Sequence, residues 1–195
     1  RSLFINLIKK SISITDIRTS SWIINSNIND SDLISSSREL GFQPIRENIL
    51  WQKPILENID EVDVKNNKDI NYFSKIKKEN IQKVLNFIRT NQTIFFRNTL
   101  DYTQQDIIRR SHKFSGVVFE NNQLIIAILL ELNYQNKDTY ELHTSLGCDD
   151  NLRHKLKFVI RKLFTDNPFS YLKTDTENKK LTNCLSQLGL KEFSN

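Results

Sequence analysis

This 195-residue chain has no methionine at all and only four glycines. The glycines are Gly41, Gly116, Gly147 and Gly189. A Walker-type phosphate loop needs two glycines followed by Lys and Ser or Thr, and a dinucleotide-binding fingerprint needs three closely spaced glycines. Neither spacing occurs, so nucleotide-binding folds that depend on such loops are excluded. Because Met is absent, we also expect that Arg1 is not the natural start and that the chain is a piece of a longer protein.

Cysteine and histidine are too few to build a disulfide or metal framework. Cys148 and Cys184 do not form a CxxC pair, which argues against a disulfide scaffold and against a zinc site. The three histidines are not at ligand spacing from one another, so no metal site is predicted. Two ordinary thiols suit a reducing compartment, and we expect a cytoplasmic protein.

Long apolar runs and concentrated charge are also missing. The longest apolar stretch, residues 124–130, has the length of a strand, whereas a membrane span needs about 18 residues. The net charge is +5, but the basic residues are spread along the chain and form no arm that could follow a phosphate backbone. We therefore expect no membrane segment and no nucleic-acid interface. A hydrophobic fraction of 38% with 12 Phe is still enough for a packed core.

The first 52 residues have the pattern of half a domain. Apolar residues at three- and four-residue spacing predict a helix from Leu3 to Ile12. Residues 21–28 are rich in β-branched and aromatic side chains, which predicts a strand. Asn29 and Asp30 can cap a helix that ends at Gly41, and residues 42–51 are expected to form a closing strand.

The rest of the chain alternates between strand and helix patterns. Turn signals and periodicity predict a mixed α/β domain with a hairpin closed by Glu120-Asn121-Asn122. Strands are expected at 70–74, 114–119, 124–132, 139–144 and 169–173, and helices at 76–88, from 103, at 152–163 and at 179–188, before a short last strand.

An internal repeat links the two parts of the chain. The segments SWIINSNINDSDLISSSRELGFQPI and SYLKTDTENKKLTNCLSQLGLKEF align around Gly41 and Gly189, an offset of 148 residues, and each follows an amphipathic helix. We therefore expect residues 1–53 to be the C-terminal half of a first unit, the first copy. Residues 70–195 form a second unit, the second copy, and residues 54–69 are a linker.

The order of these elements resembles the GNAT superfamily of acyl-CoA-dependent N-acetyltransferases. In that family the strand after the long helix leads to Asn, a helix and Leu-Gly-Phe. Here Asn178 precedes Leu188-Gly189-Leu190, and Asn29-Asp30 precedes Leu40-Gly41-Phe42. The resemblance implies a mixed, mostly antiparallel twisted sheet flanked by helices, with one near-complete unit after the C-terminal half of another.

The resemblance also implies a reaction, the transfer of acetyl from acetyl-CoA to an amine of a small molecule or peptide. The family binds the CoA pyrophosphate at a glycine-rich loop before its long helix. Arg1 and Ser2 would follow that loop in the first copy, and the cofactor-binding residues implied are Arg1, Ser2, Asn29 and Asn178. The corresponding stretch of the second copy, residues 145–152, contains two adjacent aspartates that would repel a pyrophosphate, so we expect this copy to be degenerate.

In the family a carboxylate or His on the central strand often serves as general base. The resemblance therefore implies Glu141 and His143, which share one face of the strand 139–144, as candidate catalytic bases, and Glu131 on the hairpin is another candidate. The alternative is that each is an ordinary solvated or salt-bridged strand residue. The tyrosine that often acts as general acid in the family is replaced by Ser37 in the first copy and by Leu185 in the second.

A non-catalytic module that serves dimerisation or regulation is the rival function, and homo-oligomerisation stays open. A degenerate site would let bulky side chains fill the gap between the strands 139–144 and 169–173. We expect Phe169, Tyr171 and Leu185 to do so. We also expect five apolar residues of the first copy to be buried against missing sequence, the second unit or another chain: Trp22, Ile24, Leu33, Phe42 and Trp51.

Overall fold

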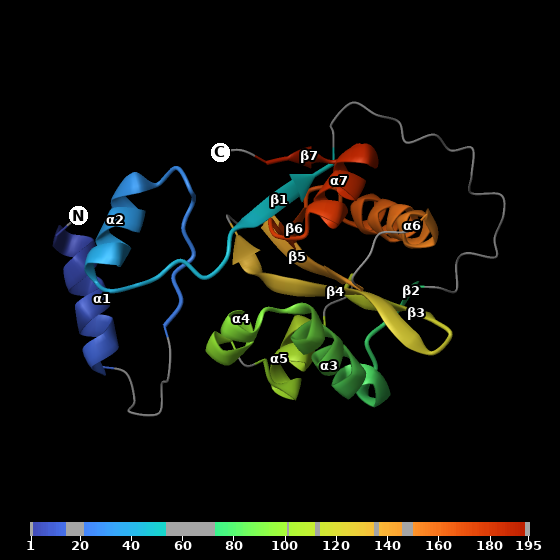
Figure 1. The fold of residues 1–195 in the computed structure, drawn as a ribbon, viewed down its shortest axis with the longest axis horizontal. Helices are drawn as coiled ribbons and strands as arrows, with labels where there is room; N and C mark the ends of the chain where they lie inside the picture. Colours follow the sequence, from blue (N-terminus) through green and yellow to red (C-terminus); the bar gives the residue numbers. More distant parts are fainter. Residues whose placement is uncertain are drawn as a thin grey trace. The chain divides into compact units, whose positions relative to one another are not determined.

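The computed structural model describes residues 2–14, 22–53, 73–100, 102–111, 114–134, 137–145 and 150–193. The chain forms two compact units, an N-terminal unit (Arg1–Ile45) and a C-terminal unit (Arg46–Ser194), shown in Figure 1. Among the described residues, no helix is long and apolar enough to cross a membrane. The expected linker at 54–69 lies outside the described residues.

The N-terminal unit contains two helices, α1 (Ser2–Ile14) and α2 (Ser31–Glu39). Residues 22–27 between them form no strand, although their composition predicts one. A β-branched segment becomes a strand only when a neighbouring strand accepts and donates its backbone hydrogen bonds. The described part of this unit supplies no such neighbour, and this accounts for the difference.

The C-terminal unit is built on a seven-stranded sheet with the order β2-β3-β4-β5-β6-β1-β7. All neighbours are antiparallel except β5 and β6, which run parallel. The strands are β1 (Asn48–Gln52), β2 (Phe73–Ser74), β3 (Gly116–Glu120), β4 (Gln123–Tyr134), β5 (Lys137–Thr144), β6 (Tyr171–Asp175) and β7 (Lys191–Glu192). This mixed, mostly antiparallel sheet confirms the predicted fold class.

Helices cover both faces of this sheet (Figure 1). One face carries the short η3 (Lys78–Asn80), α3 (Ile81–Asn91), α4 (Ile94–Thr99) and α5 (Gln104–Arg110), and the other carries α6 (Asp150–Asp166) and α7 (Lys179–Gln187). Each face has its own core. Val84 and Ile88 of α3 pack with Leu129 of β4 on the first face, whereas Leu156 of α6 packs with Tyr140 of β5 on the second.

The hairpin between β3 and β4 closes as its sequence predicts. Asn121 and Asn122 both have positive φ, 48° and 64°. Two left-handed residues in a two-residue loop match the right-handed twist of the strands, and Asn tolerates this conformation better than most residues.

Strand β1 lies far from its sheet neighbours in sequence. It is inserted between β6 and β7, with Trp51 opposite Leu172 on one side and Glu192 on the other. The Trp51 side chain is fully buried, and its Nε1 donates a hydrogen bond to Thr174 Oγ1 at 2.7 Å. A segment that the repeat groups with the first copy therefore completes the sheet of the second.

The two copies of the repeat fold alike around their glycines. Asp30 Oδ1 caps α2 by accepting from Leu33 N at 3.0 Å, and Asn178 Oδ1 caps α7 by accepting from Leu181 N at 3.1 Å. Gly41 and Gly189 have φ of 87° and 86°, the left-handed region that favours glycine at a helix end. In both copies the next residue donates back to the helix: Phe42 N to Ser37 O at 3.0 Å, and Leu190 N to Leu185 O at 3.2 Å.

Candidate functional site

The polar face of β5 contains one buried carboxylate, that of Glu141. Its Oε1 accepts a hydrogen bond from Arg46 Nη2 at 2.9 Å, and its Oε2 accepts one from Arg110 Nη2 at 2.6 Å. The three side chains are 4%, 12% and 12% exposed, so this is a largely desolvated cluster of one carboxylate and two guanidinium groups. We call Arg46, Arg110, Glu141 and His143 the Glu141 cluster.

Both arginines are held in place by further contacts. Arg110 is the last residue of α5, and its Nε donates to the carbonyl oxygen of Leu130 at 3.0 Å. Its guanidinium carbon lies 5.0 Å from the centre of the Tyr102 ring. The guanidinium of Arg46 lies 4.1 Å from the centre of the Phe96 ring. Each cation is thus stacked on an aromatic face as well as paired with Glu141.

The charges around Glu141 decide its protonation state. Burial alone would raise the pKa of this carboxyl, but His143, Arg110 and Arg46 together hold the pKa well below its ordinary value. Burial, and then the charge of Glu141, raise the pKa of Tyr102 to about 12. Glu141 is therefore charged at neutral pH, and its two oxygens already accept hydrogen bonds from cations. A carboxylate in that state is a weak proton acceptor.

His143 lies beside Glu141, as the strand parity predicts. Its Nε2 is 3.5 Å from Glu141 Oε2, and its side chain is 7% exposed. The structure thus brings the two candidate bases together. Their catalytic role stays a prediction, and the geometry of Glu141 favours charge compensation over proton abstraction.

The parallel strands β5 and β6 pair over a short distance only. Their register runs from Thr139 opposite Tyr171 to Glu141 opposite Lys173, although both strands continue beyond that pair. Beyond it, the guanidinium of Arg46 bridges the strands, with Nη2 bonded to Glu141 and Nη1 4.0 Å from Asp175 Oδ2. Arg46 therefore occupies the place where the pairing ends.

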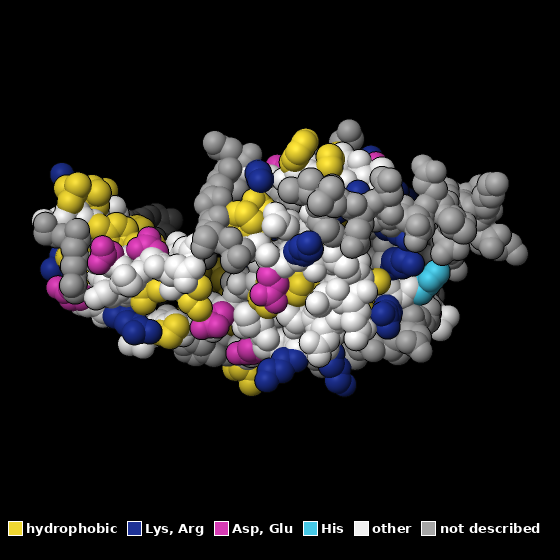
Figure 2. Space-filling model, turned by 90° about the horizontal axis from the view of Figure 1, so that it is seen from above, with side chains coloured by type: hydrophobic (Ala, Val, Ile, Leu, Met, Phe, Trp, Pro, Cys, Tyr) yellow, Lys and Arg dark blue, Asp and Glu magenta, His cyan; other side chains and the backbone are white. Residues whose placement is uncertain are grey.

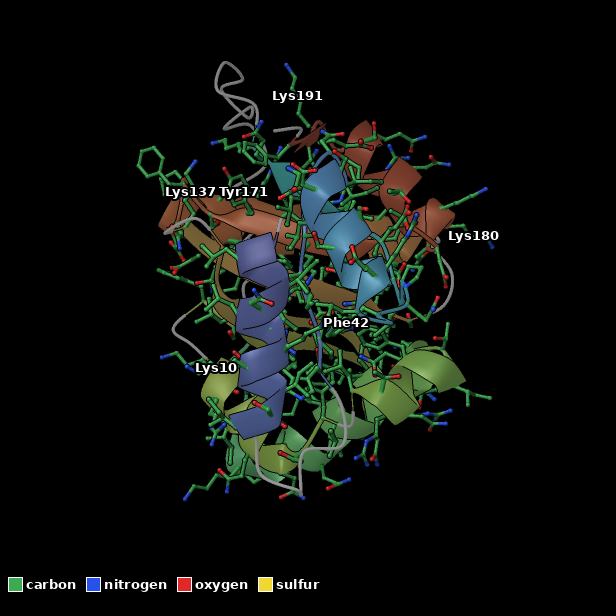
Figure 3. All side chains as sticks on the ribbon, turned by 90° about the vertical axis from the view of Figure 1, so that its left-hand side faces the viewer. Lys10, Phe42, Lys137, Tyr171, Lys180 and Lys191 are labelled. Carbon is green, nitrogen blue, oxygen red and sulfur yellow. The ribbon has the colours of Figure 1, made fainter. Side chains whose placement is uncertain are left out.

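Of the three side chains predicted to fill this gap, one was assigned wrongly. Phe169 is 79% exposed, because it lies in the loop before β6. Tyr171 and Leu185 are buried: Tyr171 lies opposite Thr139, where the two strands pair, and Leu185 belongs to the core that includes Leu142 and Leu172. Tyr171 packs against Phe193, with ring centres 4.7 Å apart, and accepts a hydrogen bond from Lys137 Nζ at 3.0 Å; Figure 3 shows Lys137 and Tyr171 side by side.

Within the described chain, only Trp51 of the five residues expected to be buried is so, and burial of the others against missing sequence or another chain stays a prediction. Trp22 is 39% exposed, and the other three predicted residues are half-buried: Ile24, Leu33 and Phe42. Trp51 differs because its strand lies inside a complete sheet.

The expected cofactor-binding residues belong to both units, Ser2 and Asn29 to the N-terminal unit and Asn178 to the C-terminal unit, and their role stays a prediction. Arg1 lies outside the described residues, as do residues 146–149 of the second-copy loop. Ser2 is the first residue of α1. Asn29 is exposed, with its backbone N–H bonded to Asn27 Oδ1 at 2.9 Å, and the side chain of Asn178 is engaged in capping α7. Within the described ranges, no group of three His, Cys, Asp or Glu side chains could hold a metal ion.

Sequence reasoning did not find Arg46 and Arg110. A glutamate in the middle of a buried strand does signal that cations must be near it, because an unpaired buried charge is very costly. Their identity is not encoded locally, since Arg46 and Arg110 lie 95 and 31 residues before Glu141.

Comparison with known proteins identifies the fold and goes no further. No protein-family model matches the chain, and no curated protein matches it. Among solved structures, an acetyltransferase from the GNAT family of Colwellia psychrerythraea is similar, with a TM-score of 0.50 and 12% identity; the match covers 85% of this chain and 59% of that protein. A functionally unknown conserved protein from Staphylococcus epidermidis has a TM-score of 0.45 and 16% identity, over 89% of this chain and 67% of the other. The fold is GNAT-like.

Proposed function

We propose that this chain is part of a GNAT-like N-acyltransferase that transfers acetyl from acetyl-CoA to an amine of a small molecule or peptide. Within it, the C-terminal unit supports the active unit and does not catalyse. The GNAT-like fold and the helix–glycine repeat favour the acyltransferase assignment. The Glu141 cluster favours a supporting, non-catalytic role for the C-terminal unit.

The observation that carries the supporting role of the C-terminal unit is that both carboxylate oxygens of Glu141 already accept hydrogen bonds from arginines. A base for amine acylation must reach the ammonium proton and accept it near neutral pH. Glu141 accepts from Arg46 and Arg110 instead, and its pKa lies well below the useful range. Glu141 is therefore poorly suited to act as the base of acyl transfer, and this favours a supporting role for the C-terminal unit.

The acyl-CoA site is accordingly assigned to the first copy, where the resemblance places Arg1, Ser2 and Asn29. Bound there, acetyl-CoA would supply an activated thioester for attack by the amine. The role of the C-terminal unit is then mechanical. It holds β1, and through β1 the end of the first copy, in a complete sheet.

A non-catalytic module for dimerisation or regulation is the second candidate, because the same closed cluster is also what a unit without any enzymatic role would retain. Calorimetry with acetyl-CoA separates the two candidates. We expect no binding by the 195-residue chain at about 10 μM. The natural protein that carries these residues should bind acetyl-CoA and release CoA thiol in the presence of an amine acceptor.

Two results would contradict this assignment. Micromolar binding by the 195-residue chain would place a working site in the C-terminal unit, the more so if Asp149→Gly with Asp150→Gly tightened it by removing charge near the pyrophosphate. Absence of binding by the natural protein would leave the non-catalytic candidate.

A further inference from the structure

Helix α1 contacts α2, and its Phe4, Ile5 and Ile8 are half-buried, but no described residue of the N-terminal unit covers its other apolar side chains. Leu3, Leu7 and Ile14 are 73%, 56% and 73% exposed, and no described side chain of α1 is buried. The space-filling view shows hydrophobic side chains on the surface of the N-terminal unit (Figure 2). A helix of 13 residues is marginal in water without tertiary packing, and the exposed leucines show that α2 covers only part of the apolar surface of α1.

The second copy shows what covers the corresponding helix. There α6 precedes the repeat segment as α1 does in the first copy. Six of its apolar residues are buried and Phe158 is half-buried; the six are Leu152, Leu156, Val159, Ile160, Leu163 and Phe164. They pack on the aliphatic and aromatic face of the sheet, including Ile126 and Ile128 of β4 and Leu142 of β5. The partner of α6 is a β-sheet face.

Residues 22–27 give a second, independent indication. In the second copy the segment aligned with them is strand β6, which pairs with β5 in parallel. In the first copy the same kind of sequence pairs with no strand among the described residues, and Trp22 and Ile23 are each 39% exposed. A β-sheet would supply both missing contacts: a neighbouring strand for residues 22–27 and an apolar face for α1.

We propose that α1 and residues 22–27 form the docking surface for a β-sheet of the first copy, one that belongs to the natural protein but not to these 195 residues. The sheet would present aliphatic side chains to α1, and its outer strand would run parallel to residues 22–27, as β5 does beside β6. This inference rests on the internal repeat and the exposed surfaces. It does not depend on the proposed acyl transfer, and it holds or fails separately.

Hydrogen exchange read by mass spectrometry tests the proposal on two proteins, the 195-residue chain and the natural protein that carries it. In the 195-residue chain, amides of α1 and of residues 22–27 should exchange rapidly. In the natural protein both segments should be protected together, by about the factor that separates α6 from free peptide in the same experiment.

A variant then ties the protection to the apolar stripe. In the natural protein, Leu7→Gln should speed exchange of α1 roughly 10- to 100-fold, the loss expected for one buried leucine. Lys9→Gln, a matched change on an exposed polar residue of the same helix, should leave the exchange of α1 unchanged.

Any other partner of the docking surface would give a distinct exchange result, and each such result would overturn the proposal. Protection already present in the dilute 195-residue chain would mean that the chain covers its own surface. Protection that grows with concentration would mean that another molecule of this chain is the partner, and protection only with anionic vesicles would mean a membrane surface. Rapid exchange of both segments in the natural protein would mean that no sheet docks there.

Discussion

The helix–glycine turn occurs twice in this molecule, in two regions that differ in almost everything else. Around Gly41 and Gly189 the caps, the φ values and the returning hydrogen bonds agree closely. Yet α7 buries Leu181, Cys184 and Leu185, whereas the only buried residue of α2 is Ser36. Local capping and one left-handed glycine therefore suffice to shape the turn, but burial requires a sheet beneath it.

The two tryptophans extend this contrast and give the largest expected effect. Trp51 is fully buried in the sheet, with Nε1 bonded to Thr174, and Trp22 is partly exposed. Trp51→Ala should lower the free energy of unfolding by about 3–5 kcal/mol, whereas Trp22→Ala should change it by less than about 0.5 kcal/mol. Urea denaturation of the 195-residue chain, followed by far-UV circular dichroism, measures both. Equal losses would show that the N-terminal unit is packed as tightly as the sheet.

The Glu141 cluster gives the second prediction, because the N-terminal unit has no described counterpart of it. Arg110→Met would remove one of two cations from a buried carboxylate, and such removals cost about 3 kcal/mol or more. Arg109→Met, one residue earlier and exposed, is the control and should cost almost nothing. Urea midpoints at pH 7 distinguish them. A similar small loss for both variants would mean that Glu141 needs only one cation.

The same carboxylate predicts how stability depends on pH. The pKa of Glu141 is held well below its ordinary value of 4.5, so the unfolded chain takes up the proton more readily than the folded one. The stabilisation is fully present above the ordinary pKa and is lost as pH falls through the lowered one. Unfolding free energies between pH 3 and 7 should therefore fall more steeply toward acid in the parent chain than in Glu141→Gln. Parallel curves would show that Glu141 does not contribute to acid sensitivity.

Sequence patterns predicted what local chemistry determines and missed what distant partners supply. The cap Asp30 and the Asn121-Asn122 turn were correct, because each depends on a few adjacent residues. Residues 22–27 were expected to be a strand, and their β-branched composition could not reveal that the partner strand is missing.

The candidate site shows the same limit. Strand parity was enough to bring Glu141 and His143 together. Arg46 could not be foreseen, because it reaches Glu141 only when β1 enters a sheet made of much later residues. Helix α4 was overlooked because its six residues, IFFRNT, carry no helical periodicity of their own.

Gly41 and Gly189 allow the two units to be compared with one matched substitution. Both are left-handed, so replacement by Ala should strain either turn by about 1–2 kcal/mol. Only Gly189→Ala should lower the free energy of global unfolding, because only α7 belongs to the cooperative core. Gly41→Ala should instead loosen α2 locally, visible as faster hydrogen exchange of its amides with an unchanged urea midpoint. A shifted midpoint for Gly41→Ala would mean that the two units unfold together.

The helix caps give the smallest expected effect. They also test whether the N-terminal unit belongs to the cooperative core. Asn178→Ala removes the oxygen that accepts from Leu181 N, and Asp30→Ala removes the one that accepts from Leu33 N. Each loss costs its own helix about 1 kcal/mol. For Asn178→Ala the loss should appear in the urea midpoint, and Asn178→Ser, which keeps an acceptor, should recover most of it. For Asp30→Ala the midpoint should stay where it is while exchange of the first α2 amides rises about fivefold. If instead Asp30→Ala shifted the midpoint as far as Asn178→Ala does, the N-terminal unit would share the cooperative core, and the missing sheet would no longer be needed to explain its exposed residues.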